Sequence, residues 1–415
     1  MPGWPKNVDY SKHDAGVAGP LAGGWSLDLP GLTESEARLL REMRQHLAAQ
    51  VRAADGALPF DRFMETALYA PGLGYYVNGR RKFGEAGDFV TAPELSPLFS
   101  RCVARQVGQC LDLVNGDTVL EVGAGSGKMA ADMLVELAAL DRLPQEYLIL
   151  ELSPSLQELQ RETLAARAPQ LLPRVAWLQD LPESGFRGVV VGNELLDAMP
   201  VQRFRRWRGG WQELSVAGDA NGMHDRWTEI RSPGLAGALA ALWPDDAAVV
   251  EGYSSELNLR LAPWLRAVAE RMRRGYLLLI DYGYSRGEYY HPQRSQGTLI
   301  CHFRHRAHAD PYLLPGLQDI TANVDFSALA TAASDAGFSL AGFTTQAHFL
   351  IDSGLQDLLA ESDPSDIKHH LQCMQGVKKL TLPSEMGERF KVMALARDAP
   401  PALSGFRSRD LRGRL

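Results

Sequence analysis

The sequence predicts an α/β fold: a mostly parallel sheet of seven strands, with an antiparallel edge strand, packed between helices and preceded by an added helical region. Three observations support this prediction. Short apolar runs alternate with helical periodicity between residues 118 and 282, a glycine-rich turn joins the first run to a helix, and helical patterns dominate residues 33–115. The expected core strands are Thr118–Val122, Tyr147–Leu152, Val175–Leu178, Gly188–Gly192 and Tyr276–Tyr282.

The composition is that of an ordinary globular protein, with 45% hydrophobic and 22% charged residues among 415. A net charge of −7 disfavours nucleic acid as a partner, and we assign the arginine-rich stretch 203–208 to the solvated face of a hairpin. The four cysteines lack metal-ligand spacing, so we expect no metal, reduced thiols and a cytoplasmic location. No apolar run is long enough for a membrane span.

The N-terminal region is expected to contribute to the functional site. Residues 1–32 are rich in glycine and proline and predict a flexible tail. Thr33 and Glu36 form a capping-box pattern that predicts a helix running to about Arg52. Further helical patterns cover 60–68 and 93–113, and the glycine-rich stretch between them predicts a long loop.

Residues 116–398 are predicted to form the core domain, with two departures from strand–helix alternation. A hairpin turning at Gly209 and Gly210 is expected within residues 203–230. Residues 283–320 show no clear periodicity and predict a long loop that covers the substrate. Runs at 341–350 and 390–397 predict the antiparallel edge strands, and residues 399–415 a C-terminal tail.

The glycine turn is the most informative motif. In the run from Glu121 to Gly127, the P-loop pattern fails at both ends, and the dinucleotide fingerprint fails because Lys128 stands at its third glycine position. Gly123, Gly125 and Gly127 let a ligand approach the backbone, and Glu121 suits an ammonium group, contacted directly or through water, but repels a pyrophosphate. The pattern resembles the first motif of class I methyltransferases, which implies S-adenosylmethionine as the cofactor; the alternative is a glycine turn without a ligand.

Two acidic residues follow the next strands in the order this cofactor requires. Glu151 ends the second strand, where a carboxylate accepts hydrogen bonds from ribose hydroxyls. Asp180 follows the third strand, where it would accept the adenine amino group, although a helix-capping aspartate explains it equally well.

The fourth strand ends in Asn193 and Glu194, with Asp197 close behind, on the expected substrate side. We assign Asn193 to the cofactor site, and Glu194 and Asp197 as catalytic residues that hold a cationic nucleophile, for which a guanidinium is the best match. Capping of the next helix is the alternative role for Asp197. The Asn-Pro-Pro-Tyr motif of amide and adenine methyltransferases is absent.

Five separated blocks together resemble the MidA/NDUFAF7 family of class I methyltransferases. The blocks are residues 87–94, 121–127, 193–197, 281–283 and 319–326. The resemblance implies that Thr91 and Glu94 line the site and that Gly87 and Asp88 lie in a loop closing over the cofactor. A tight turn before a helix begun by Pro93 explains these residues as well. For the mitochondrial member, an assembly factor of respiratory complex I, the resemblance implies symmetric dimethylation of protein arginine.

The resulting hypothesis is methylation of arginine in a protein substrate, with a homodimer possible. The alternatives are methylation of a small molecule or another protein residue, and an assembly chaperone that retains the fold without catalysis. His305 and His308 are candidates for the proton acceptor, although a surface or structural histidine is the commoner role.

Overall fold

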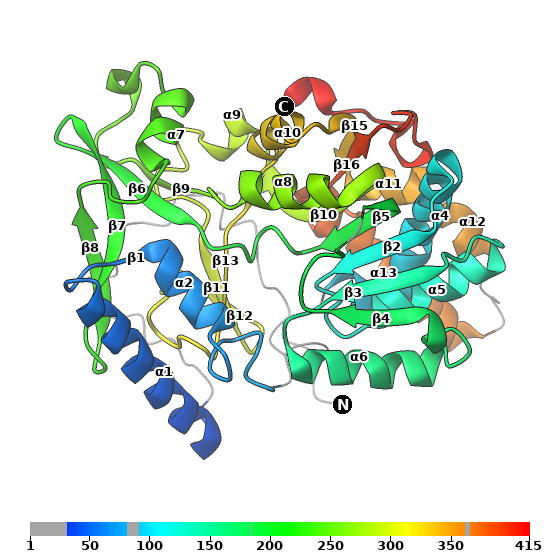
Figure 1. Ribbon diagram of the computed structural model, residues 1–415, viewed down its shortest axis with the longest axis horizontal. Coiled ribbons are helices and arrows are strands. Elements are labelled where there is room, and N and C mark those ends of the chain that lie inside the picture. Colours follow the sequence, from blue (N-terminus) through cyan, green and yellow to red (C-terminus); the bar gives the residue numbers. More distant parts are fainter. Residues whose placement is uncertain (1–30, 81–90, 184, 362–365) are drawn as a thin grey trace.

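The computed structural model describes residues 31–80, 91–183, 185–361 and 366–415, so the predicted N-terminal tail falls almost wholly outside the described residues. Two lobes stand side by side in Figure 1. We call residues 31–80, 201–259 and 286–321 the accessory lobe; nearly all the rest forms the core. The described helices contain no segment long and apolar enough to cross a membrane.

The core sheet confirms the predicted seven-stranded architecture. Its order is β4 (Val175–Leu178), β3 (Glu146–Leu150), β2 (Thr118–Val122), β5 (Phe186–Asn193), β10 (Met272–Tyr284), β16 (Phe390–Arg397) and β15 (Ser339–Thr345). The first five strands are parallel, and β16 is antiparallel to both neighbours, so the antiparallel strand lies one position in from the edge. The short β14 (Val324–Asp325) extends the sheet at the end of β10. Because the parallel strands share one direction, their carboxyl ends meet along one edge.

Helices cover both faces of this sheet. Val119, Val189 and Val191 point into one hydrophobic cluster with α4 (Pro97–Val114), α5 (Lys128–Ala139) and α6 (Pro154–Arg167). The alternate residues Leu120 and Val190 point into a second cluster with α8 (Leu261–Arg271) and α10 (Phe326–Asp335). Strand alternation thus divides one run of apolar residues between two cores.

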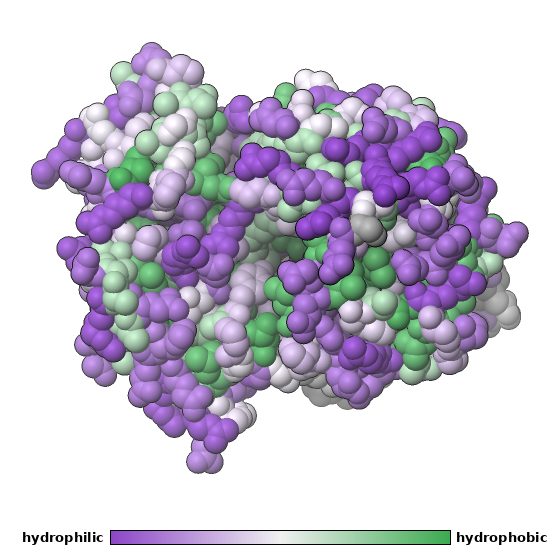
Figure 2. Space-filling model, in the orientation of Figure 1, coloured by the Kyte–Doolittle hydropathy of each residue, from purple (hydrophilic) through white to green (hydrophobic). Residues whose placement is uncertain are grey.

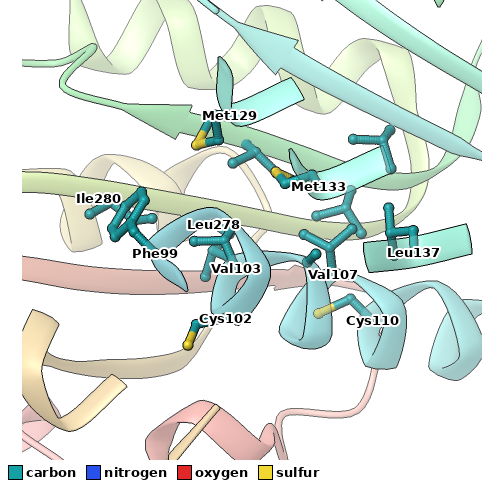
Figure 3. Packing of buried hydrophobic residues seen from close by; sticks show 14 of the residues in the cluster. Phe99, Cys102, Val103, Val107, Cys110, Met129, Met133, Leu137, Leu278 and Ile280 are labelled. Carbon is teal, nitrogen blue, oxygen red and sulfur yellow. The ribbon is translucent and has the colours of Figure 1, made fainter. Parts of the chain in front are cut away.

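The packing of α4 shows how sequence signals define a core helix. Ser96 caps its first turn, Pro97 occupies the first position, and Asn115 ends the helix in the left-handed conformation. Phe99 and Val103 lie on its buried face, fully shielded from solvent, in the cluster that Figure 3 shows. Loss of a buried phenylalanine side chain typically costs about 3–5 kcal/mol, so this face anchors the helix firmly.

The accessory lobe has its own sheet and core. Its sheet contains β1 (Leu58–Pro59), β6 (Gln202–Trp207), β7 (Gly210–Gly218), β8 (Met223–Thr228) and β9 (Ser254–Leu257). Against it pack α1 (Glu34–Ala53), which has the predicted capping box at Thr33, and α2 (Phe60–Tyr69). The hairpin turns at Gly209 as predicted but is part of a larger sheet, because β1 and β9 add to it from distant parts of the chain.

Two stretches differ from the sequence expectation. Residues 283–320 are not a loop throughout: they contain α9 (Arg286–Tyr289) and a small sheet in the order β12 (Arg306–His308), β11 (Ile300–Phe303), β13 (Asp319–Thr321). These strands are three or four residues long, too short for periodicity to reveal. Residues 399–415 dock on the core, with Phe406 in one hydrophobic cluster and Leu411 in the other.

The remaining helices are short, apart from one. They are α3 (Ala92–Leu95), α7 (Leu235–Leu242), α11 (Gln346–Asp352), α12 (Leu355–Ala360), α13 (Ile367–Thr381) and α14 (Met386–Arg389). The four cysteines lie among the described residues, and all are buried and outside any disulfide.

Candidate active site

The glycine loop leaves β2 at the carboxyl edge of the sheet and leads directly into α5. Its glycines have φ values of +71° at Gly123, +54° at Gly125 and +81° at Gly127. A residue with a Cβ atom would lose roughly 1–2 kcal/mol in this left-handed conformation. This cost explains why glycine stands at every second position of the loop. The loop therefore presents bare backbone at the start of a helix.

Gln160 on α6 braces the glycine loop, and sequence reasoning missed it. Its amide nitrogen donates to the Gly125 carbonyl at 3.1 Å and to the Glu151 carboxylate at 3.0 Å, while its oxygen accepts from the Trp177 indole at 2.9 Å. A Cβ atom on Gly127 would come within 3.0 Å of the Gln160 Cα. One buried amide thus connects the carboxyl ends of β2, β3 and β4. No local pattern in the sequence predicts this role.

Glu121 is fully buried at the end of β2. Tyr147 donates a 2.5 Å hydrogen bond to one carboxylate oxygen, and the other, Oε1, has no hydrogen-bond partner among the described residues. Burial raises the pKa of Glu121 to about 7, with the nearby Glu151 charge adding to the rise and the Tyr147 bond opposing it. A buried carboxylate oxygen without a donor is costly, so the site suits a ligand that brings a positive charge.

The two other predicted acidic positions differ in burial. Glu151 is buried, and its carboxylate accepts from the Ser153 N–H at 2.9 Å and from Gln160. A carboxylate can accept about four hydrogen bonds, and the contact of Glu151 with the ribose hydroxyls stays a prediction. Asp180 follows β4 with an exposed side chain, and its place at the adenine stays a prediction.

The short helix α3 connects the glycine loop to the substrate side. The Glu94 carboxylate accepts from the Ser126 hydroxyl and from the Lys128 ammonium group. Thr91 stands at the cap position of α3 but makes no capping bond there, so its role in the site remains a prediction. The predicted residues Gly87 and Asp88 lie outside the described residues.

The substrate side is built from the turn that follows β5. Glu194 has φ of +51°, which is uncommon for a residue with a side chain and often marks a functional position. Burial raises the pKa of Glu194 to about 8, and the Asp197 charge adds to the rise; hydrogen bonds from Asn193 and the Ala92 N–H oppose it. Asn193 donates to the Glu194 carboxylate at 3.1 Å.

Asp197 lies beside Glu194 and is 5% exposed. Burial raises its pKa to about 6, although the Tyr282 hydroxyl, 2.6 Å from Oδ2, opposes the rise. Its other oxygen, and the side-chain oxygen of Asn193, lack hydrogen-bond partners among the described residues. The turn thus offers open acceptors where a substrate would bind.

Asp281 at the end of β10 holds this turn in place. Its Oδ2 accepts the N–H groups of Leu196 at 2.9 Å and Asp197 at 3.2 Å, and its Oδ1 accepts that of Tyr282. The Asp281 carboxylate is 1% exposed, and burial together with the neighbouring negative charges holds its pKa well above the usual range. In the sequence, Asp281 and Tyr282 stand out only through the family resemblance, and their contacts in the structure give them a structural part in the site.

Of the two histidines proposed as proton acceptors, His308 fits the role less well than the carboxylates do. His308 lies on β12, the edge strand of the small sheet, and its Nδ1 accepts the Asp310 N–H at 3.3 Å. Burial lowers its pKa. A local turn contact on an edge strand indicates a structural role.

The residues present fit S-adenosylmethionine. The oxygen of Glu121 without a partner among the described residues suits its ammonium group, and the glycine loop admits the ligand to the backbone. Figure 2 shows a hollow in the surface between the accessory lobe and the core. The 3-2-1-4-5-7-6 strand order, counted in chain order within the core sheet, and these carboxylates define the class of S-adenosylmethionine-dependent methyltransferases.

Comparison with known proteins identifies the family. The model of a family of putative S-adenosyl-L-methionine-dependent methyltransferases matches residues 102–344, and the chain belongs to this family, which confirms the predicted cofactor and enzyme class. A likely methyl transferase from Burkholderia thailandensis, crystallised with S-adenosyl-homocysteine, is similar with 46% identity and a TM-score of 0.89, over 93% of this chain and 100% of that one.

Curated relatives agree with the resemblance. The protein arginine methyltransferase NDUFAF7 of Danio rerio is 30% identical, over 88% of this chain and 89% of its own length. Its Homo sapiens counterpart is 29% identical, over 85% and 83%. Both are named mitochondrial, which contradicts the predicted cytoplasmic location. Cysteine usage was a poor guide because the four thiols are buried and therefore protected in any compartment.

Proposed function

We propose that this protein methylates arginine side chains of a protein substrate. The observation that carries the proposal is a group of three carboxylates beside the glycine loop: the partly buried Glu194 and the buried Asp197 and Asp281. None of the three forms an ion pair with a lysine or arginine among the described residues. Buried anions are costly unless they are paired, so the pocket favours a cation from outside.

The arrangement suits a guanidinium better than an ammonium group. Arginine offers five N–H donors in a planar fork that matches a carboxylate, whereas lysine is a compact point charge. Glu194 and Asp197 lie near enough for the charge of Asp197 to raise the pKa of Glu194. A bound guanidinium would reverse this effect, lowering both pKa values and restoring the charged carboxylates.

Catalysis would rest on positioning and on charge. The cofactor supplies an electrophilic methyl group when it is bound. Glu194 would then orient the guanidinium so that one nitrogen forms the new N–CH₃ bond as the S–CH₃ bond breaks. An arginine nitrogen must also lose a proton as the methyl group is transferred, and Glu194, charged in the complex and hydrogen-bonded to the guanidinium, is the carboxylate placed to accept it. Asp197 would stabilise the positive charge of the product.

The relatives support this choice of substrate, because both are named protein arginine methyltransferases. A part in the assembly of respiratory complex I, a homodimer and the degree of methylation stay predictions from the resemblance.

The test is methyl transfer from labelled S-adenosylmethionine to arginine-rich peptides and to the same peptides with lysine in place of arginine. We expect methylarginine on amino-acid analysis of the first set only. Glu194→Gln should lower kcat by at least about 100-fold, the usual size of a general base contribution, while binding of S-adenosyl-homocysteine stays unchanged. The exposed Glu183 supplies the matched control Glu183→Gln, which should leave kcat unchanged.

Two outcomes would contradict the proposal. Transfer to lysine peptides or to small molecules alone would leave a methyltransferase of another specificity. Binding of the cofactor without transfer to any acceptor would support the chaperone alternative instead.

A further inference from the structure

The hydrophobic clusters of the described residues divide at the boundary between the two lobes. Two clusters take their side chains from the core and three from the accessory lobe, with Ala322 beside the boundary in one of the three. A cavity lies at this boundary, lined by Leu196 and Leu261 of the core and by Val201 and Leu257 of the accessory lobe. Two bodies without a shared hydrophobic core move easily relative to one another. Polar contacts across the boundary therefore decide how the lobes are held.

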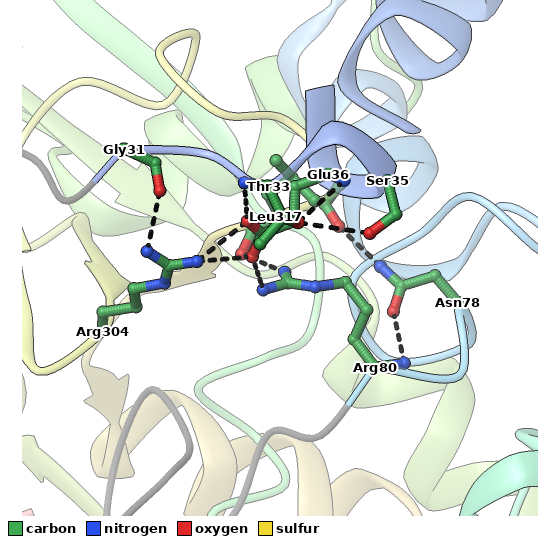
Figure 4. Close-up of polar contacts among 9 residues, drawn as sticks. Gly31, Thr33, Ser35, Glu36, Asn78, Arg80, Arg304 and Leu317 are labelled. Atoms are coloured by element: carbon green, nitrogen blue, oxygen red, sulfur yellow. Dashed lines mark hydrogen bonds and ion pairs between the residues drawn. The ribbon is translucent and has the colours of Figure 1, made fainter. Parts of the chain in front are cut away.

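The accessory lobe itself is held together as one body. Met43 of α1 and Phe63 of α2 are fully buried in one hydrophobic cluster with strands of the lobe's sheet. Figure 4 shows Arg80 and Arg304 converging on the buried Glu36 of α1, and these ion pairs join α1 to the turn between β11 and β12. A contact that fixes α2 to the core therefore fixes the whole lobe.

One polar stripe of α2 faces the core. Asp61, Glu65 and Tyr69 are four residues apart, which places them along one side of the helix. The Tyr69 hydroxyl donates to the Ala198 carbonyl at 2.9 Å, within the turn that follows β5. Both carboxylates contact Arg260, the residue that precedes α8 where the chain returns to the core. The stripe thus connects α2 to the core along its length.

Arg260 binds the stripe with the geometry of a specific ion pair. Its Nη1 donates to one carboxylate oxygen of Glu65 at 2.7 Å and its Nη2 to the other at 3.0 Å, and Nη2 also lies 3.5 Å from Oδ2 of Asp61. A bidentate fork of this kind fixes direction as well as distance. Hydrogen bonds from Arg260 lower the pKa of Glu65, so both partners are charged at neutral pH.

We propose that Arg260 is a positioning residue for the acceptor: it clasps α2 to the core and so holds the accessory lobe beside the turn that carries Glu194 and Asp197. For its acceptor the inference rests on the proposed function, since the acceptor binds in the hollow between the lobes (Figure 2). The cofactor residues Glu121 and Glu151 belong to the core alone. Release of the clasp therefore weakens binding of the acceptor and leaves binding of the cofactor as it is.

The test is a charge reversal and its rescue. Arg260→Glu places a third carboxylate beside Asp61 and Glu65, so KM for an arginine peptide should rise at least about fivefold, the effect of losing a partly exposed ion pair. The kcat value and the affinity for S-adenosyl-homocysteine should stay within about twofold, because only acceptor binding is changed. The double variant Arg260→Glu with Glu65→Arg restores the opposite charges and should return KM to within about twofold of the unaltered protein.

A milder variant keeps the test independent of how well the charge reversal folds. Glu65→Gln removes the same pair from the side of α2 without adding a charge, and it should raise KM by about threefold. Arg266→Glu is the matched control, because Arg266 is exposed on the same helix α8 and the charge change is identical. Its KM should equal that of the unaltered protein.

Small-angle X-ray scattering of the ligand-free proteins gives a readout that needs no acceptor. Arg260→Glu should have a larger radius of gyration than the unaltered protein, because the lobes separate when the clasp is lost. The charge-swapped double variant and the Arg266→Glu control should both have the radius of the unaltered protein.

The outcomes separate the two proposals. An unaltered protein that methylates no arginine peptide overturns the proposed function, while the scattering of the variants still decides whether Arg260 clasps the lobes. Normal arginine methylation with an unchanged KM in Arg260→Glu and Glu65→Gln overturns this inference alone. So does a double variant without recovery, because Arg260 would then act through the fold and not through its charge on α2.

Discussion

Glu194→Gln should stabilise the ligand-free protein at alkaline pH although it lowers kcat. Burial raises the pKa of Glu194 from 4.5 to about 8. At about pH 8, Glu194 is therefore deprotonated in the unfolded chain but still partly protonated in the folded protein. Taking up this proton reduces the free energy of unfolding. About three pKa units at 1.36 kcal/mol each give a penalty of roughly 4 kcal/mol.

The sign of the pH dependence follows from the direction of the shift. A carboxyl group with a raised pKa destabilises the fold increasingly as the pH rises from its unfolded value to its folded one. At about pH 5 the unfolded chain is itself partly protonated, and the penalty falls below about 1 kcal/mol. Glutamine has no proton to lose, so the benefit of the substitution should be large at about pH 8 and small at about pH 5.

Thermal unfolding of the ligand-free protein measures this difference. For 415 residues, an unfolding entropy of about 2.1 cal/mol/K per residue converts 4 kcal/mol into a Tm increase of roughly 4–5 °C at about pH 8. The control Glu183→Gln should show no such pH-dependent gain. A Glu194→Gln variant that melts at or below the unaltered protein at about pH 8, or with the same difference at both pH values, would refute the reasoning.

Three further predictions follow from the site. Gln160→Leu removes three buried hydrogen bonds, so it should lower the affinity for S-adenosyl-homocysteine in calorimetry by about tenfold or more; unchanged affinity would exclude its bracing role. Tyr282→Phe removes a bond that lowers the pKa of Asp197, so the acidic limb of the kcat/KM profile should move to higher pH by up to about one unit; an unmoved limb would exclude titration of Asp197. Cofactor affinity should fall as the pH drops through about 7, where Glu121 takes up a proton, and Glu121→Gln should bind weakly with little pH dependence; equal pH dependence in both proteins would disprove the contact.

The sequence was sufficient for the core because its signals are local. Most parallel strands are compact apolar runs that lead into a helix, and the glycines between Glu121 and Gly127 mark a turn with left-handed backbone. Glu151 follows β3 and Glu194 follows β5. Because these parallel strands share a direction, both residues lie at the carboxyl edge of the sheet, as the sequence predicts.

The accessory lobe could not be predicted in the same way. Its sheet pairs Leu58 with Val216 and Gln202 with Leu257, which are far apart in the chain. The paired segments are only a few residues long. The contact between Tyr76 and Asp319 spans 243 positions and depends on this assembly. Sequence periodicity records which face of an element is buried, not which distant element covers it.

The most direct test of the account is calorimetric binding of an arginine peptide and its citrulline counterpart to the protein saturated with S-adenosyl-homocysteine. Citrulline keeps the shape of the arginine side chain and lacks its charge. If the carboxylates of Glu194 and Asp197 recognise a guanidinium, the citrulline peptide should bind at least about tenfold more weakly, and Glu194→Gln should reduce that difference. Equal binding of the two peptides would contradict the claim that this pocket selects a cation.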